Sequence, residues 1–249
     1  MGQETQDRLA RRRVETKIRI SGDEASRIVS QLPASGERRG DIVTVYLDRP
    51  DGLLARRALT TPQEAVKVRV RDYMDGSPLV WLEVKERRQG WVHKARLPLP
   101  RESVDAVLRG ILTPMPSCRC EDCMRALRET LTRLSALSQG PWTRVGAVSV
   151  RRRTFYFDGA PLRVTLDEDV RYFRLAQDPF AEGRTPTPDV LAPPVHRDPQ
   201  AILEVKHAGV LPDWWGDVAP TEGDAGPSKF ISLLGYLGKA AARAGAGGA

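Results

Sequence analysis

The chain has 249 residues, of which 41% are hydrophobic and 29% are charged. This composition supports a folded core and excludes an intrinsically disordered chain as the default. The net charge of +7 and the pI near 9.6 predict an anionic partner, which composition alone leaves open between nucleic acid, an acidic membrane surface and phosphorylated molecules. No run of 18 apolar residues is present, so we expect no transmembrane helix.

Eight segments have the period-two alternation of polar and apolar residues that is typical of β-strands. They cover residues 14–20, 42–48, 65–76, 81–88, 91–99, 147–157, 161–169 and 201–207. Apolar residues at helical spacing, together with start signals such as Pro100 and Ser228, predict helices over residues 22–32, 101–112, 121–139 and 228–245.

The remaining segments are not predicted to form elements. Residues 178–199 are rich in proline and predict a loop. Residues 1–10 and 246–249 are predicted to be flexible ends. We therefore expect a single domain over residues 11–245.

The strand at 65–76 has an unusual distribution of charge. Lys67, Arg69 and Arg71 alternate with three valines. Since residues two apart in a strand point to the same face, the three cations share one face and the valines share the other. For a single strand, the simplest interpretation is a half-solvated antiparallel sheet with its cations in water.

The same pattern recurs on the other predicted strands. Their cations at alternating positions are Lys17, Arg69, Arg71, Lys85, Lys94, Arg96, Arg152, Arg163 and Lys206. Acidic residues share some of these faces: Glu15 accompanies Lys17, Glu83 accompanies Lys85, and Glu204 accompanies Lys206. A sheet patterned in this way can close with its charged face inside and helices over its apolar face. We predict an α+β protein built on a closed eight-stranded antiparallel barrel.

Cations packed inside such a barrel need counter-charge. Interior glutamates can pair with some of them. A polyanionic ligand can pair with the rest through charge-assisted hydrogen bonds, and the remaining carboxylates can hold a divalent metal that bridges phosphate oxygens. The pattern therefore predicts a tunnel for phosphate chains.

The ordered set of motifs resembles the VTC domain of the CYTH-like triphosphate tunnel metalloenzyme superfamily. The matching segments are RVETK (13–17), VYLD (45–48), KVRVRDY (67–73), LEVK (82–85), KARLPL (94–99), RRRTF (151–155), LRVTLD (162–167), ILEVK (202–206) and SKF (228–230). The resemblance spans nearly the whole chain. It implies a tunnel that binds triphosphate, nucleotide or polyphosphate with Mn²⁺ or Mg²⁺.

The resemblance also implies roles for individual residues. The phosphate-binding residues it implies are Lys17, Arg69, Arg71, Lys85, Lys94, Arg96, Arg152, Arg163, Lys206, Ser228 and Lys229. Among these, Arg69, Arg71 and Lys229 are the catalytic candidates, together with Glu204. Glu204 is also the first metal ligand, and Glu15 and Glu83 are the other carboxylates that could assist it.

The activity implied by the VTC resemblance is transfer of the terminal phosphate of ATP to a polyphosphate chain. RVETK lacks the paired glutamates of the ExExK signature found in the wider CYTH group, which favours the VTC branch over a two-metal hydrolase. Hydrolysis of triphosphate, and binding of polyphosphate or nucleotide without turnover, are the alternatives. Nucleic acid is not an expected partner because no aromatic stacking platform accompanies the cations.

Cellular context is predicted from two further features. The first residues lack the apolar stretch of a secretory signal. Three clustered cysteines, Cys118, Cys120 and Cys123, argue for a reducing compartment, and we expect the cytoplasm. A zinc site at these thiols would need a fourth ligand. VTC proteins of eukaryotes act with membrane-embedded partners, so a membrane partner protein is a further expectation.

Overall fold

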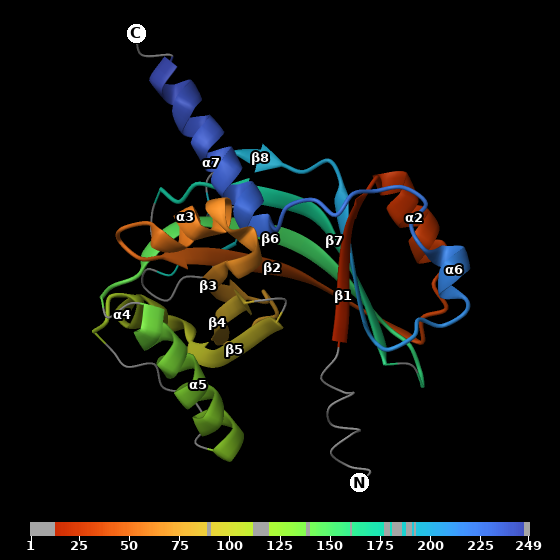
Figure 1. The fold of residues 1–249 in the computed structure, drawn as a ribbon, viewed down its shortest axis with the longest axis horizontal. Coiled ribbons are helices and arrows are strands. Elements are labelled where there is room, and N and C mark those ends of the chain that lie inside the picture. Colours follow the sequence, from red (N-terminus) through yellow and green to blue (C-terminus); the bar gives the residue numbers. More distant parts are fainter. Residues whose placement is uncertain are drawn as a thin grey trace. The chain divides into compact units, whose positions relative to one another are not determined.

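The computed structural model describes residues 13–88, 91–111, 120–137, 140–159, 161–176, 180, 186–187, 191 and 193–246 (Figure 1). Residues 1–10, Cys118 and half of the predicted loop 178–199 lie outside the described residues. The chain forms two compact units. Unit 1 contains residues 1–41, 150–170 and 197–227, and unit 2 contains residues 42–149, 171–196 and 228–249.

The strands form one mainly antiparallel sheet. Their bounds are β1 Arg13–Ile20, β2 Gly36–Asp48, β3 Val66–Asp72, β4 Leu79–Arg88, β5 Trp91–Pro100, β6 Thr143–Tyr156, β7 Leu162–Phe173, β8 His196–Arg197 and β9 Ala201–Ala208. The order is β1-β9-β7-β6-β2-β3-β4-β5, and β8 pairs with β7. All eight predicted strands are present. The short β8, inside the predicted Pro-rich loop, was missed.

The prediction of a closed barrel is wrong. In the described part of the chain, β1 and β5 end the strand order and do not pair with each other. The alternation of charges identifies which face of each strand is apolar, but closure depends on which strands become neighbours. The alternation carries no information about that.

The helices are α2 Gly22–Gln31, α3 Leu53–Thr60, α4 Val104–Leu108, α5 Glu121–Leu137, α6 Trp215–Val218 and α7 Lys229–Ala246, with 3₁₀ turns η1 Pro62–Glu64 and η2 Arg101–Ser103. The four predicted helices are present, although 101–112 is shortened to η2 and α4. The sequence prediction missed α3. Its first turn is held by the buried Asp48 carboxylate, which accepts hydrogen bonds from the backbone N–H groups of Leu54 and Ala55, both at 2.8 Å.

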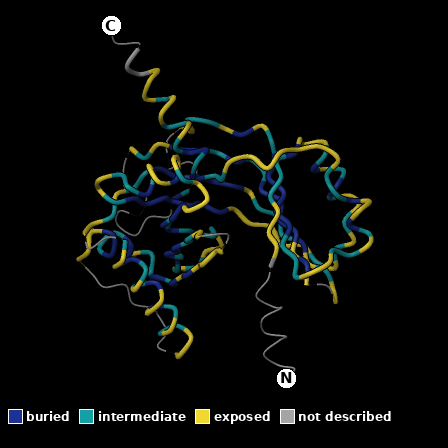
Figure 2. Tube along the Cα trace, in the orientation of Figure 1, coloured by how far each residue is buried: buried dark blue, intermediate teal, exposed yellow. Residues whose placement is uncertain are grey.

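Unit 1 has its own apolar core. Leucines and valines of β7 and β9 pack against Ala25 and Ile28 of α2 and against Trp215 of α6. Figure 2 shows long buried stretches along the strands of the sheet. α2 begins after Ser21, whose hydroxyl accepts a hydrogen bond from the Glu24 N–H, a standard N-cap.

A strap formed by residues 219–227 passes beside β1 within unit 1. The Arg19 N–H donates to the Asp224 carbonyl at 2.8 Å, so the strap makes a one-residue bridge with β1. The Thr221 N–H donates to the Glu24 carboxylate at 2.8 Å, which ties the strap to α2. Gly223 has φ +137° and lies so close to β1 that an added Cβ would be 2.4 Å from the Arg19 carbonyl oxygen.

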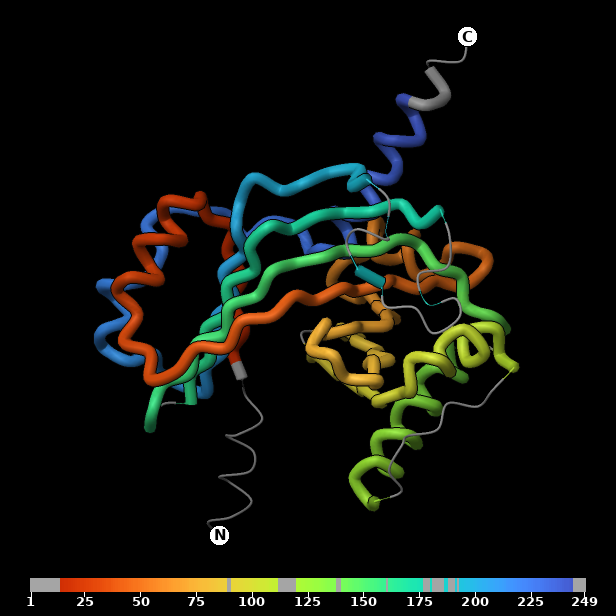
Figure 3. The backbone as a smooth tube through the Cα atoms, turned by 180° about the vertical axis from the view of Figure 1, so that it is seen from behind, coloured from red at the N-terminus to blue at the C-terminus, as the bar shows by residue number. Residues whose placement is uncertain are grey.

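Unit 2 is built on the valine face of β3. The three valines are buried with apolar residues of β2, β4 and β5, and helices α3, α4 and α5 contribute Leu54, Leu108, Leu127 and Leu134 to the same cluster. Figure 3 shows α5 running beside the β4–β5 hairpin. The prediction that helices cover the valine face is confirmed. No helix in the described residues is long and apolar enough to span a bilayer.

Candidate functional site

The cation face of β3, β4 and β5 in unit 2 is organised around one buried acid. Strand register aligns Tyr46, Arg69, Glu83 and Arg96 in a single cross-strand row. The Arg69 Nε donates to Glu83 Oε2 at 2.7 Å, and Lys94 Nζ lies 2.6 Å from Glu83 Oε1. Arg71 Nη1 is 3.9 Å from Oε2. We call Arg69, Arg71, Glu83 and Lys94 the unit 2 cluster.

The ionisation of the unit 2 cluster follows from this geometry. The Glu83 side chain is 0% exposed, and burial alone would raise its pKa. Arg69, Arg71 and Lys94 outweigh burial and hold that pKa well below its usual range. In Arg69, burial likewise opposes the charge, but Glu83 raises the pKa of the guanidinium. The carboxylate is therefore ionised and the arginine charged.

Lys94 behaves differently. Burial lowers its pKa to about 8, assisted by Arg69 and Arg71 and opposed by Glu83. Three cations thus share one carboxylate, and the cluster keeps an excess of positive charge. The next row contains only lysines, because Lys85 lies directly opposite both Lys67 and Lys94. Excess cations on a half-buried face are the arrangement that a phosphate chain would neutralise.

The start of α7 lies in the same unit. Ser228 precedes the helix, and its hydroxyl accepts a hydrogen bond from the Ile231 N–H at 3.5 Å. Phe230 is 1% exposed and stacks on Tyr46 with ring centroids 4.8 Å apart. Because Tyr46 is the cross-strand partner of Arg69, this stack fixes Ser228 and Lys229 at the Tyr46 end of the unit 2 cluster.

A second charged cluster lies in unit 1, on β1 and β9. Lys17 is paired with Glu15, and its Nζ lies 3.2 Å from Glu204. Lys206 pairs with Glu204, and its Nζ lies 3.3 Å from Glu15. We call these four residues the unit 1 cluster. By strand register, Arg163 of β7 is directly opposite Lys206, and its exposed side chain makes no ion pair with the described residues.

The unit 1 cluster also keeps its acid ionised. The Glu204 side chain is only 8% exposed, and burial would raise its pKa. Lys17, Lys206 and Arg152 reverse this effect and hold the pKa well below the usual range. Burial also opposes the charge on Lys17, but Glu204 and Glu15 raise its pKa. Glu204 and Lys17 are therefore both charged at neutral pH.

The sequence prediction missed two acids of unit 1. Arg152 is held by Asp167, with Nη2 donating to Oδ2 at 2.7 Å. Arg19 Nη1 lies 3.0 Å from Asp198 Oδ2. The sequence pattern could have identified Asp167 as a residue of the charged face, since it follows Arg163 and Thr165 at alternating positions of β7. No sequence pattern could have identified Asp198, because it lies between β8 and β9 and not on a strand with alternating residues.

The carboxylates differ in their suitability for a metal ion. Among the described residues, no group of three or more His, Cys, Asp or Glu side chains gathers as a ready-made metal site. Glu15 and Glu204 both reach Lys17 and Lys206, so their oxygens lie close together. Mg²⁺ is commonly held by one or two carboxylates plus substrate phosphates, which this pair fits. Cations lie at both oxygens of Glu83, and lysines likewise lie at both oxygens of Glu15 and of Glu204, so a metal ion in either cluster would have to displace them. What distinguishes the unit 1 cluster is that it offers a pair of carboxylates.

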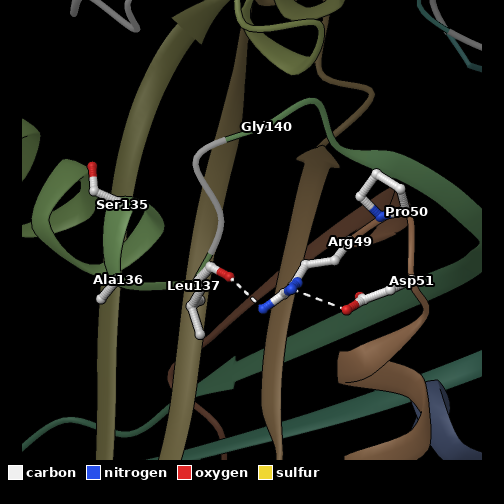
Figure 4. A pocket seen from close by; sticks show the side chains of 7 residues that line it. All are labelled: Arg49, Pro50, Asp51, Ser135, Ala136, Leu137 and Gly140. Carbon is white, nitrogen blue, oxygen red and sulfur yellow. Dashed lines mark hydrogen bonds and ion pairs between the residues drawn. The ribbon is translucent and has the colours of Figure 1, made fainter.

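Two pockets in the described residues lie elsewhere in unit 2. One of about 500 Å³ is lined by Arg49, Asp51, Leu137 and their neighbours, and contains none of the predicted phosphate ligands. Figure 4 shows that its arginine is already used: Arg49 donates to the Leu137 carbonyl at 3.3 Å and to Asp51 at 2.9 Å. A second pocket, of about 460 Å³, also lacks these ligands.

A solved structure shares this fold at low sequence identity. HpAC1 from Hippeastrum, described as a putative adenylyl cyclase with a dominant triphosphatase activity, is 15% identical; the alignment covers 90% of this chain and 95% of that one, with a TM-score of 0.55. A putative adenylate cyclase from Bacillus halodurans is 14% identical over 79% of this chain and 80% of that one, with a TM-score of 0.46.

Sequence comparison identifies the family. No curated protein matches the chain. Residues 6–231 match the VTC domain, and this range contains all of the predicted site residues. The resemblance inferred from the ordered motifs is thereby confirmed, and the protein belongs to the VTC domain family.

Proposed function

We propose that this protein is a metal-dependent phosphotransferase that moves the terminal phosphate of ATP onto an inorganic polyphosphate chain. The observation that carries the proposal is the unit 2 cluster, where three cations share one buried carboxylate and the adjoining row contains only lysines. Such a surface is completed by a polyanion. Membership of the VTC domain family supports a phosphate chain as that polyanion.

The proposed reaction needs no covalent intermediate on the protein. An ionised terminal oxygen of polyphosphate attacks the γ-phosphorus of ATP, a new P–O bond forms, and the bond between the γ-phosphorus and the β–γ bridging oxygen breaks. The electron pair of that bond leaves with ADP. Because the attacking oxygen is already ionised, the protein contributes mainly positioning and charge stabilisation.

Individual residues take distinct roles in this proposal. Arg69 and Arg71 orient phosphate oxygens, and Lys229 at the start of α7 binds the transferring group. Lys17, Lys206 and the exposed Arg163 bind phosphates in unit 1. Glu204, with Glu15, would hold Mn²⁺ or Mg²⁺, which would supply charge neutralisation on phosphate oxygens.

Hydrolysis of triphosphate is the second candidate. Water in place of the phosphate acceptor would convert the same site into a triphosphatase, and the Hippeastrum protein of similar fold is described with that activity. Transfer ranks first because Arg13 begins RVETK where the wider CYTH signature has a glutamate, which leaves Glu15 as its single acid. Fewer carboxylates favour one metal ion over two.

The test is a product assay on the purified protein. ATP is supplied with Mn²⁺ or Mg²⁺, with and without a short polyphosphate primer, and products are resolved by gel and phosphate assay. We expect long chains from wild type and none from Lys229→Ala or Glu204→Gln. Lys239→Ala, ten residues further along α7, is the matched control and should retain activity.

Each outcome assigns the protein to one class. Free phosphate without chain growth would overturn transfer in favour of hydrolysis. Tight polyphosphate binding by calorimetry without either product would leave a binding protein. If a folded Arg69→Ala/Arg71→Ala variant binds polyphosphate as well as wild type does, the phosphate site is wrongly assigned.

The cellular setting is part of the proposal. We expect the protein to act in the cytoplasm, and any coupling to transport would need a membrane-embedded partner protein, since no helix in the described residues can span a bilayer. Recovery of such a partner by affinity purification from detergent-solubilised membranes would test this expectation.

A further inference from the structure

Arg96 of β5 lies opposite a buried acid but does not bind it. Strand register places Arg96 directly across from Glu83. The described partners of Glu83 are instead Arg69, Arg71 and Lys94. The Arg96 guanidinium lies over the ring of Trp81, with its central carbon 4.5 Å from the ring centroid. The exposed guanidinium of Arg96 thus contacts the aromatic ring of Trp81 instead of the carboxylate of Glu83.

Trp81 is an aromatic residue on the face that otherwise carries the cations. It is the direct cross-strand partner of Arg71, so their Cβ atoms are about 5 Å apart. Arg96 reaches it on the diagonal, because the residue directly opposite Trp81 on β5 is Pro98. The ring is half-buried. Tyr73 adds a second ring, whose centroid lies 6.0 Å from the central carbon of the Arg71 guanidinium.

We propose that Trp81 and Arg96 form a stacking platform for the base of a nucleoside triphosphate. The base would lie on the outer face of the Arg96 guanidinium and extend the stack that Trp81 begins, while Arg71 beside Trp81 binds phosphate. This inference rests on the proposed function and specifies its donor: a nucleotide is selected over inorganic triphosphate by contacts with its base.

Geometry favours a base over another phosphate at Arg96. A guanidinium grips phosphate through the N–H groups at its edge, whereas its flat faces stack on planar rings. Here the Arg96 guanidinium carbon lies over the Trp81 ring and the side chain remains exposed, which leaves the side of the guanidinium away from Trp81 open to a base. Stacking of bases on aromatic rings and on arginine planes is a common and sequence-tolerant mode of nucleotide recognition.

The experiment compares two ligands that differ only in the nucleoside. Affinities for ATP and for inorganic tripolyphosphate are measured by calorimetry on wild type, Arg96→Lys and Trp81→Leu. Arg96→Lys keeps the charge and removes the plane. We expect ATP affinity to fall about tenfold in both variants, and tripolyphosphate affinity to change less than about twofold. Trp91→Leu removes a 71% exposed tryptophan at the start of β5, the strand of Arg96, and serves as the control.

Tryptophan fluorescence, measured on a milder variant, tests the platform even if Trp81→Leu misfolds. Trp81→Phe keeps an aromatic ring of smaller size but removes the indole. ATP should quench tryptophan emission more strongly in wild type than in Trp81→Phe, and tripolyphosphate should quench the two proteins equally.

Three results would overturn the inference. An equal loss of ATP and tripolyphosphate affinity in Arg96→Lys and Trp81→Leu would make Arg96 a phosphate ligand. Unchanged affinities in both variants would show that the contact between Trp81 and Arg96 only packs the end strand β5 and binds no base. The proposed function would then still stand. Wild type that binds neither ligand would overturn the proposed function itself, and the platform with it.

Discussion

At the residue scale, Glu83 is the group on which the unit 2 cluster depends. Glu83→Gln removes the only carboxylate that Arg69, Arg71 and Lys94 share in the described structure. Because the three cations would then lose the buried carboxylate that they share, we expect the free energy of unfolding to fall by about 3–5 kcal/mol. Urea unfolding measures it, and added tripolyphosphate should restore part of the loss.

Glu86→Gln is the matched control on the same strand. Glu86 points to the opposite face and pairs with Arg133, and both side chains are partly exposed. A partly exposed pair of this kind contributes little, so the expected loss is below about 1 kcal/mol. Equal losses in the two variants would contradict the role assigned to Glu83.

The lowered pKa of Lys94, about 8, gives the site a pH dependence. Lys94 is charged only below that pKa, so raising the pH through 8 removes a cation from the cluster. We expect affinity for tripolyphosphate to fall between pH 7 and pH 9, by up to about tenfold per pH unit above the pKa. Lys94→Arg stays charged and should flatten the profile, as measured by calorimetry; parallel profiles would refute the assignment.

For single residues, the sequence allowed us to predict the charge and the face of the strand on which the residue lies. The alternation in β3 correctly separated buried valines from half-buried cations. The partner of each cation was not predictable, since an ion pair depends on which strands become neighbours. Arg152 illustrates the limit: its partner Asp167 lies on β7, and only the fold brings the two strands together.

At the element scale, the strap at 219–227 depends on Gly223. Gly223→Ala adds a Cβ that would meet the Arg19 carbonyl oxygen at 2.4 Å, and backbone cannot move aside as a side chain can. We expect the strap to detach from β1, so that the Arg19 amide, which donates to Asp224, exchanges its hydrogen much faster. Hydrogen exchange followed by mass spectrometry or NMR measures this directly.

Gly209→Ala is the control that distinguishes the steric clash of an added Cβ from the strain of a positive φ. Gly209 also has a positive φ, +93°, but an added Cβ there meets nothing within 4 Å. It should cost about 1–3 kcal/mol of stability through φ strain and leave exchange of the Arg19 amide unchanged. Faster Arg19 exchange in both variants would show that the strap is not held by close approach at Gly223.

Strong periodic elements were predictable, and elements set by tertiary contacts were not. The eight patterned strands and the leucine-rich α5 appear where expected. α3 has too short a pattern to be identified, and a buried side chain of the preceding strand, Asp48, caps it. Closure of the sheet was predicted wrongly for the same reason: strand neighbours are a tertiary property.

At the scale of the whole molecule, phosphate binding should be visible as stability. Any ligand that binds only the folded chain stabilises it, by about 2.7 kcal/mol at a hundredfold excess over its Kd. For a chain of this size that corresponds to a rise in Tm of about 5–10 °C. Differential scanning fluorimetry with tripolyphosphate, against sodium chloride at equal ionic strength, measures the shift. Equal shifts with both salts would indicate screening instead of a site.

The pairing of β1 with β9 has a consequence for how the chain is made. β1 leaves the ribosome before the other described strands of the sheet, yet its neighbour β9 is the last of them to be synthesised. During translation β1 therefore remains unpaired until β9 has been synthesised. Contacts between segments so distant in sequence slow folding. Its alternating Glu15, Lys17 and Arg19 would protect it in that interval, because charged side chains discourage an unpaired strand from aggregating.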